Sequence, residues 1–135
     1  MTHEPRRIDP DRFWEANKDY VDRIERDGVH VVYDATLDTL FVEFGGPTEA
    51  LSEHFSDNIM VRIDPDTLQI VGFEVLDFFS DFLPFNRLFR PAVRDLGLRE
   101  GTDSRVTLME PRFREHVDFL EVMFPRLVHS IVGQN

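Results

Sequence analysis

The residue types that most often do chemistry in proteins are either missing from this chain or widely spread. It has no cysteine, which excludes a thiol nucleophile, a thiolate metal site and a disulfide framework. The five histidines are all more than four residues apart, and no glycine-rich phosphate loop, nucleophile elbow or metalloprotease signature occurs. A metal site would need folding to bring His30, His54 and nearby carboxylates together. We therefore predict no catalytic residue, no cofactor and no metal site.

The abundant carboxylates are better explained by turns than by acid–base catalysis. Aspartates flank two predicted hairpin turns, at 34–38 and at 64–67, where an aspartate accepts hydrogen bonds from its own backbone. Glu74 differs from these residues, because its place in a strand could direct its side chain toward apolar neighbours. Functional carboxylates often lie in such surroundings. The alternative is that Glu74 pairs with Arg62 across a hairpin.

A phenylalanine-rich segment is the second candidate for function. Six of the thirteen phenylalanines fall between Phe73 and Phe89, and a small domain has difficulty burying so many large rings from one short segment. Either the segment caps one face of a sheet, or it forms a self-association surface or the lining of an apolar pocket. The candidate interface or pocket residues, with Glu74, are Phe78, Phe79, Phe82, Phe85, Leu88 and Phe89.

The stretch from Val29 to Asp77 predicts the sheet that would position these residues. Apolar and polar side chains alternate along it, as a strand with one buried face requires. The connections are short, rich in Gly, Pro and Asp, and leave no room for a crossover helix, so adjacent strands must be antiparallel. This pattern predicts a four-stranded antiparallel β-meander, and the run 105–109 is a candidate fifth strand.

The same stretch resembles a known family. A Tyr-Asp turn leads into a strand, and a later strand of the form VGFEVLD closes the hairpins. The residues that carry this pattern are Tyr33, Asp34, Asp38, Leu40 to Val42, Asp64 and Val71 to Asp77. They are similar to domain-of-unknown-function family 2283, a small β-domain typical of short bacterial or phage-associated proteins. The chain departs from it at Phe73, where the family has an aliphatic residue, and at Thr67-Leu68, where it has a glycine. The family has no established activity, so the resemblance implies a fold and assigns no catalytic residue.

A helix is predicted on the N-terminal side of the sheet, over 9–27. Asp9 is a suitable N-cap, Pro10 fits the first helical position, and Gly28 suits the left-handed residue that follows a helix. Phe13 and Asn17 begin the stripe that this helix would bury.

The extension 78–132 is predicted to be helical and rich in aromatic residues. One helix is expected to start near Pro84 and to bury a stripe of Phe85, Leu88 and Phe89. A last helix is expected to open at Glu110-Pro111 and to present a broad apolar arc to two neighbours.

Length and charge limit the class of protein. With 135 residues, 41% hydrophobic and 30% charged, the chain is expected to form one globular domain over 1–135. The net charge of −11 disfavours nucleic acids and anionic membranes and favours a basic protein partner. No apolar run is long enough to cross a bilayer and no secretory signal precedes the domain, so a cytoplasmic location is expected.

These observations together predict an α+β domain, with a four- to five-stranded antiparallel β-meander packed against N-terminal and C-terminal helices. The leading functional hypothesis is a non-enzymatic interaction module that forms a homodimer through its apolar surface. The alternative is a small-molecule-binding protein or enzyme, with an apolar pocket between sheet and helices and Glu74 as its polar group.

Overall fold

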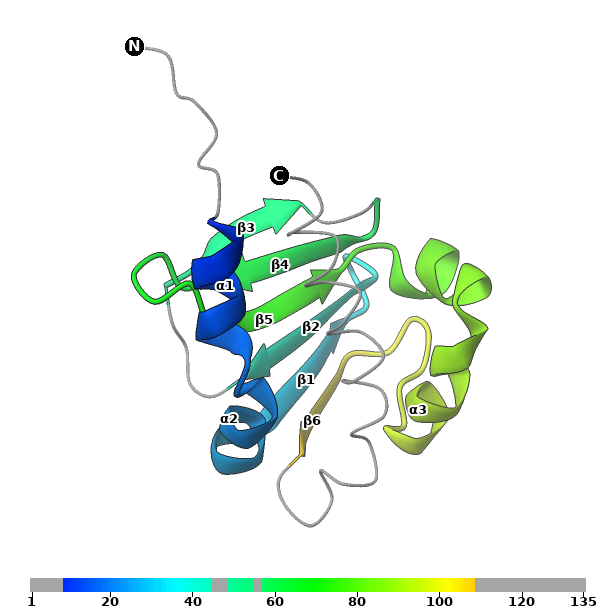
Figure 1. Ribbon diagram of the computed structural model, residues 1–135. Helices are drawn as coiled ribbons and strands as arrows, with labels where there is room; N and C mark the ends of the chain where they lie inside the picture. The colour runs from blue at the N-terminus through cyan, green and yellow to red at the C-terminus, as the bar shows by residue number, and fades with distance from the viewer. Residues whose placement is uncertain (1–8, 45–48, 55–56, 109–135) are drawn as a thin grey trace.

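The computed structural model describes residues 9–44, 49–54 and 57–108. Within these residues the main element is an open antiparallel sheet of six strands in the order β3-β4-β5-β2-β1-β6 (Figure 1). The strands are β1 (Val29–Asp34), β2 (Thr39–Phe44), β3 (Leu51–His54), β4 (Ile59–Ile63), β5 (Ile70–Val75) and β6 (Ser104–Leu108).

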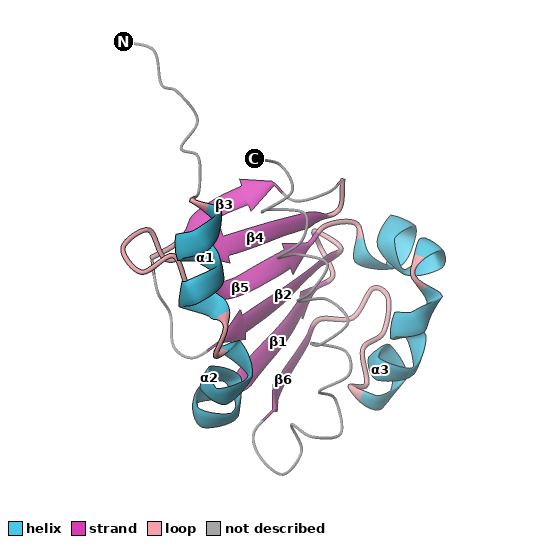
Figure 2. Ribbon diagram, in the orientation of Figure 1, coloured by secondary structure: helices cyan, strands magenta, loops and turns pink. Residues whose placement is uncertain are grey.

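Short helical elements accompany the sheet, so the chain is an α+β protein. They are α1 (Pro10–Asn17), α2 (Tyr20–Asp27), the π-helical turn η1 (Phe78–Phe82), the 3-10 turns η2 (Leu83–Phe85) and η3 (Arg87–Phe89), and α3 (Arg90–Asp95). All of them lie on the same side of the sheet, with α1 and α2 at one end of the strands and α3 at the other (Figure 2). None of these described helices is both long and apolar enough to cross a membrane.

The two predicted hairpins are present, and aspartates form their turns as the sequence indicated. β1 pairs with β2, and β4 pairs with β5. The Asp34 carboxylate accepts hydrogen bonds from the backbone N–H groups of Thr36 and Leu37, and the Asp64 carboxylate accepts them from the two residues at 66 and 67. Each turn is therefore held by its own first aspartate.

The predicted meander of four or five strands is wrong in strand count and in strand order. β5, and not β4, lies beside β2, so β2 together with the β3-β4-β5 run forms a Greek-key arrangement. β3 was missed because its sequence, LSEH, shows no apolar alternation; it is a short edge strand with mostly exposed side chains. The candidate strand at 105–109 is β6, which pairs with β1 at the other edge.

The predicted helix over 9–27 is two helices, because Asn17 interrupts it. The Asn17 side chain is buried, and its Nδ2 donates to the carbonyl of Phe13, 2.9 Å away, and to that of Leu68, also 2.9 Å away. Its Oδ1 accepts from the backbone N–H of Ile70 at 2.8 Å and from Arg23 at 3.0 Å. A side chain that bonds to the helix backbone competes with the regular ladder. Asn17 thus ends α1 and fastens both helices to the start of β5.

The predicted helix starting near Pro84 is also corrected. Helical turns begin at Phe78, directly after β5, and continue to Asp95 with a break at Asn86, whose φ of −135° is not helical. Phe85 is 82% exposed and so lies outside any buried stripe. Pro91 occupies the first turn of α3, where its missing N–H leaves no backbone hydrogen bond unmade. The predicted last helix, from Glu110, lies outside the described residues.

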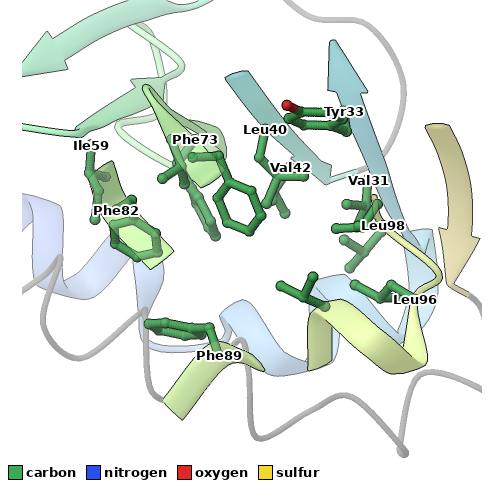
Figure 3. Close-up of a cluster of buried hydrophobic side chains, with 14 of the residues drawn as sticks. Val31, Tyr33, Leu40, Val42, Ile59, Phe73, Phe82, Phe89, Leu96 and Leu98 are labelled. Atoms are coloured by element: carbon green, nitrogen blue, oxygen red, sulfur yellow. The ribbon is translucent and has the colours of Figure 1, made fainter. Parts of the chain in front are cut away.

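A single hydrophobic core fills the space between the sheet and these helical elements. Val42 and Phe73 lie toward Phe82 and Phe89, and Val31 lies beside Leu98 (Figure 3). Phe13 of α1 belongs to the same cluster, which shows that both ends of the helical layer cover the same face. Gly28 connects α2 to β1, and its φ of 79° turns the chain from the helix into the strand.

We expect Asn17→Ala to lower the free energy of unfolding by roughly 2 to 4 kcal/mol, because it leaves several buried backbone groups unpaired at once. Urea unfolding followed by circular dichroism measures the change. The control is Lys18→Ala, which removes an exposed ion pair with Glu15 and should cost less than about 1 kcal/mol. Equal effects of the two substitutions would contradict the role given to Asn17.

Candidate functional site

Most phenylalanines of the phenylalanine-rich segment belong to the hydrophobic core. Phe78, Phe82 and Phe89 are buried, and their rings follow one another with centroid distances of 5.9 and 5.5 Å. Phe79 is partly buried and meets the ring of Tyr33 edge-on at 5.0 Å. Of the predicted candidates, Phe85 alone is exposed among those whose side chains the structure describes; the side chain of Leu88 is not among them. The segment therefore caps one face of the sheet.

The Asp38 carboxylate fixes the start of this segment. Asp38 lies in the β1–β2 turn with a φ of 50°, in the left-handed region. Its Oδ1 accepts hydrogen bonds from the Tyr33 hydroxyl at 2.7 Å and from the N–H of Phe79 at 3.1 Å, and its Oδ2 accepts from the N–H of Ser80 at 3.0 Å. Its backbone carbonyl accepts from the N–H of Phe78 at 2.8 Å. The Asp38 carboxylate thus has a structural role, like the other turn aspartates.

The pKa values of this pair reflect burial and mutual hydrogen bonding. Burial acts to raise the pKa of Asp38, but the hydrogen bonds from Tyr33, Phe79 and Ser80 outweigh it and hold that pKa below its ordinary value. Burial, reinforced by the bond to Asp38, raises the pKa of Tyr33 to about 12. The neutral tyrosine and the charged aspartate are therefore the stable forms over the physiological range.

The opposite face of the sheet, which we call the open face, is the better candidate for function. No described element lies over it (Figures 1 and 2). Strand pairing places one row of side chains straight across it, from the β6 edge to the β3 edge. This apolar-centred row is Arg105, Val32, Phe41, Glu74, Met60 and His54.

Glu74 lies at the centre of that row. Its cross-strand neighbours are Phe41 on β2 and Met60 on β4, so apolar side chains flank it on both sides, as one reading of the sequence expected. Met60, and not Arg62, stands directly opposite Glu74, and Arg62 forms an ion pair with Glu43. Glu74 is partly exposed, so its carboxylate keeps contact with solvent.

A second, polar row runs beside the first. Its members are Thr107, His30, Glu43, Gly72, Arg62 and Ser52. His30 and Thr107 form a hydrogen bond of 3.1 Å between ring nitrogen and hydroxyl, and Arg62 and Glu43 approach to 3.6 Å. This ion pair passes over Gly72, which lies between the two residues in the row. The polar row thus satisfies most of its own groups by cross-strand pairs.

Position 72 requires a glycine, because the neighbouring strand β2 approaches it closely. A Cβ built at this position would lie 2.5 Å from the carbonyl oxygen of Val42, a distance that real side chains do not adopt. The missing side chain also leaves room for Arg62 to reach Glu43. β5 contains one extra residue just before this point, because Arg62 pairs with Gly72 whereas Ile63 pairs with Ile70.

The formal charges of these two rows balance. The two rows contain two carboxylates, Glu43 and Glu74, and two guanidinium groups, Arg62 and Arg105. The formal sum is zero, in a chain whose net charge is −11. The two rows are therefore less acidic than the chain as a whole.

The two histidines that the structure describes, His30 and His54, lie apart and do not form a metal site with each other. His30 belongs to the polar row on β1, whereas His54 lies in the other row at the β3 edge. Among the described residues no group of three or more histidine, aspartate or glutamate side chains is placed to hold a metal ion. The site is thus a surface of mixed apolar and charged groups without an evident reactive centre.

Sequence reasoning identified Glu74 but missed the rest of the open face. Val32, Phe41 and Met60 occupy the positions between buried residues in their strands, which places them on the other side of the sheet from the core. That three apolar side chains share this side was visible in the sequence. Their alignment in one row was not, because it depends on β2 lying beside β5.

Comparison with protein-family models, with curated proteins and with solved structures gave no match. The resemblance of the stretch from Val29 to Asp77 to family 2283 therefore stays a prediction.

We expect protein stability to depend on Tyr33 at alkaline pH. Between pH 10 and 12 the folded state keeps the Tyr33 proton that the unfolded state has released, so the contribution of Tyr33 is complete below pH 10 and is lost as the pH approaches 12. The loss should be of the order of 2 kcal/mol.

The measurement is urea unfolding across this range for the wild type and for Tyr33→Phe. Their difference is the informative quantity, because other groups titrate in both proteins. Equal declines would show that Tyr33 ionises as easily in the folded state as in the unfolded one.

We expect Gly72→Ala to destabilise the sheet by about 2 kcal/mol or more, because the new methyl group overlaps the Val42 carbonyl and no flexible side chain can move aside. Thermal and urea unfolding measure the effect. Ser52→Ala, in the same row but exposed at the edge, serves as the control and should change stability by less than about 0.5 kcal/mol. A neutral Gly72→Ala variant would refute the close approach.

Proposed function

We propose that this chain is a non-enzymatic interaction module that forms a homodimer, with the open face of one copy packed against the open face of a second. The single observation that carries the proposal is the row of Val32, Phe41 and Met60 on a sheet face that no described element covers. Burial of such a row between two sheets removes apolar surface from water, which is the main driving force of association.

The charge distribution supports a second copy as the occupant. Two chains of net charge −11 repel each other, so self-association is easiest through a region that is not acidic. The two rows of the open face have this property, because their two glutamates are matched in number by Arg62 and Arg105. A two-fold axis presents the same mixed surface from both sides and allows each carboxylate to meet a guanidinium group.

The geometry gives less support to a small-molecule site or an enzyme. The phenylalanines that would line an apolar pocket contact one another in the core. The partly buried carboxylate of Asp38 already accepts hydrogen bonds from Tyr33 and from backbone N–H groups. Glu74 lies on the side of the sheet away from these rings, so the pocket and its expected polar group are separated.

Two further parts of the proposal rest on charge and composition. The net charge of −11 would steer a basic protein toward the dimer, as complementary charge raises association rates. The absence of cysteine is in keeping with a cytoplasmic location, where a protein makes no use of disulfides.

We expect the wild type to be a dimer in light scattering and Phe41→Glu to be a folded monomer, because two added carboxylates would face each other across the interface. Phe85→Glu makes the same chemical change on a distant exposed site and should remain a dimer. Val32→Lys tests the same row with the opposite charge. Circular dichroism confirms that each variant is folded.

A monomeric wild type would overturn the proposal. A dimer that Phe85→Glu dissociates, and that Phe41→Glu and Val32→Lys leave intact, would move the interface from the open face to the phenylalanine-rich segment.

A further inference from the structure

The outer side of the segment 84–94 combines exposed arginines with an exposed aromatic ring. Its inner side is fixed in the core by Phe82, Phe89 and Val93, all of them buried. Three side chains on its outer side, Arg87, Arg90 and Arg94, are exposed, as is Phe85. We call these four residues the arginine–phenylalanine surface.

Phe85 is held in its exposed position by the turns around it. It is 82% exposed, more than the other exposed large hydrophobic residues Leu37, Trp14 and Leu51 at 60%, 57% and 42%. The Asn86 side chain donates to the carbonyl of Phe82 at 2.8 Å, and the Asn86 N–H donates to that of Leu83 at 3.1 Å. An isolated exposed ring is common on protein surfaces. The exposure of Phe85 therefore indicates a binding surface only in combination with the arginines of the same segment.

The three arginines lie on one side of a continuous helical run. They follow one another at spacings of three and four residues through η3 and α3, which brings them to neighbouring positions on the helix surface. Within the described part of the chain, they form no ion pair, whereas Lys18, Arg23, Arg26 and Arg62 each have an acidic partner. The described residues of this acidic chain thus leave three neighbouring arginines without an ion pair.

We propose that the arginine–phenylalanine surface binds an acidic protein segment that carries an apolar residue. Guanidinium groups bind carboxylates through paired hydrogen bonds, and arginine and aromatic residues are enriched among the side chains that dominate binding energy. The arginines would hold the carboxylates of such a segment, and Phe85 would bury its ring against the apolar side chain.

The overall charge of the chain selects a short segment over an extended polyanion. At physiological ionic strength exposed charges are screened beyond about 8 Å. A short segment along α3 is therefore attracted by the three arginines, meets one carboxylate at Asp95, and is hardly affected by acidic groups farther away. A nucleic acid duplex or an anionic bilayer extends past the stripe and meets the acidic remainder of a chain of net charge −11.

This binding is separate from the dimer proposed above, because the arginine–phenylalanine surface belongs to the segment 84–94 on the helical side of the sheet and the open face lies on the other. Either proposal can fail without the other.

The test is an NMR titration of the full chain with a glutamate-rich synthetic peptide that has two central leucines. We expect amide shifts centred on 84–94 and an affinity that falls with added salt. The double substitution Arg90→Glu and Arg94→Glu should weaken binding about tenfold or more. Arg12→Glu is the matched control, since Arg12 is an exposed arginine on α1 and its replacement should change the affinity little.

Phe85→Ser should weaken binding of the leucine-containing peptide but not of an all-glutamate peptide, whereas Leu37→Ser should affect neither. Absence of shifts at millimolar peptide, or shifts located elsewhere, would overturn the proposal. Phosphatidylserine vesicles that bind the chain through Phe85 more tightly than the peptide does would overturn it as well, because they would make a membrane the occupant.

Discussion

The Asp38 carboxylate is the interaction on which the arrangement of the helical layer depends. It receives the Tyr33 hydroxyl from its own hairpin and two backbone N–H groups from the turn that follows β5. The chain must adopt a left-handed conformation at Asp38 to make these bonds, at a cost that non-glycine residues rarely bear. A neighbouring bond joins the same turn to the loop before β6, from the N–H of Ala35 to Asp103. One end of the sheet is therefore held together by hydrogen bonds to the carboxylates of Asp38 and Asp103.

The sheet has two faces with different requirements. The face beneath α1, α2 and α3 is filled by aliphatic and aromatic side chains, and the buried amide of Asn17 makes hydrogen bonds through both its nitrogen and its oxygen. The open face carries an apolar row beside a row of cross-strand polar pairs. An antiparallel sheet tolerates water on one face, so the fold does not require a cover there. What distinguishes this face is the coincidence of aligned apolar residues with balanced charge.

The sequence was informative where a structural feature depends on neighbouring residues. The hairpin turns followed from Asp34 and Asp64, and the end of α2 followed from Gly28. It failed where distant residues compete for the same backbone. The break after Asn17 depends on Leu68 and Ile70, and the helical turns at Phe78 depend on Asp38. No local sequence pattern identifies these distant partners.

The same limit applies to the candidate site. Glu74 attracted attention because a carboxylate stood in an apolar strand, and this was a local signal. Its neighbours Phe41 and Met60 come from two other strands, and one of these strands, β2, is placed beside β5 only by the return of the chain from the β3 edge. A surface assembled across strands in this way cannot be read from the order of residues along the chain.

The strand order also constrains how the protein folds. Each hairpin, β1–β2 and β4–β5, closes a short loop and can form early from local contacts. The centre of the sheet joins β2 to β5, so it can form only after the intervening chain, including β3, has found its place. Folding rates fall as contacts become less local. We therefore expect docking of the two hairpins, and the still less local pairing of β1 with β6, to be slower than hairpin formation. Until the hairpins dock, their inner edges are open to pairing with other chains.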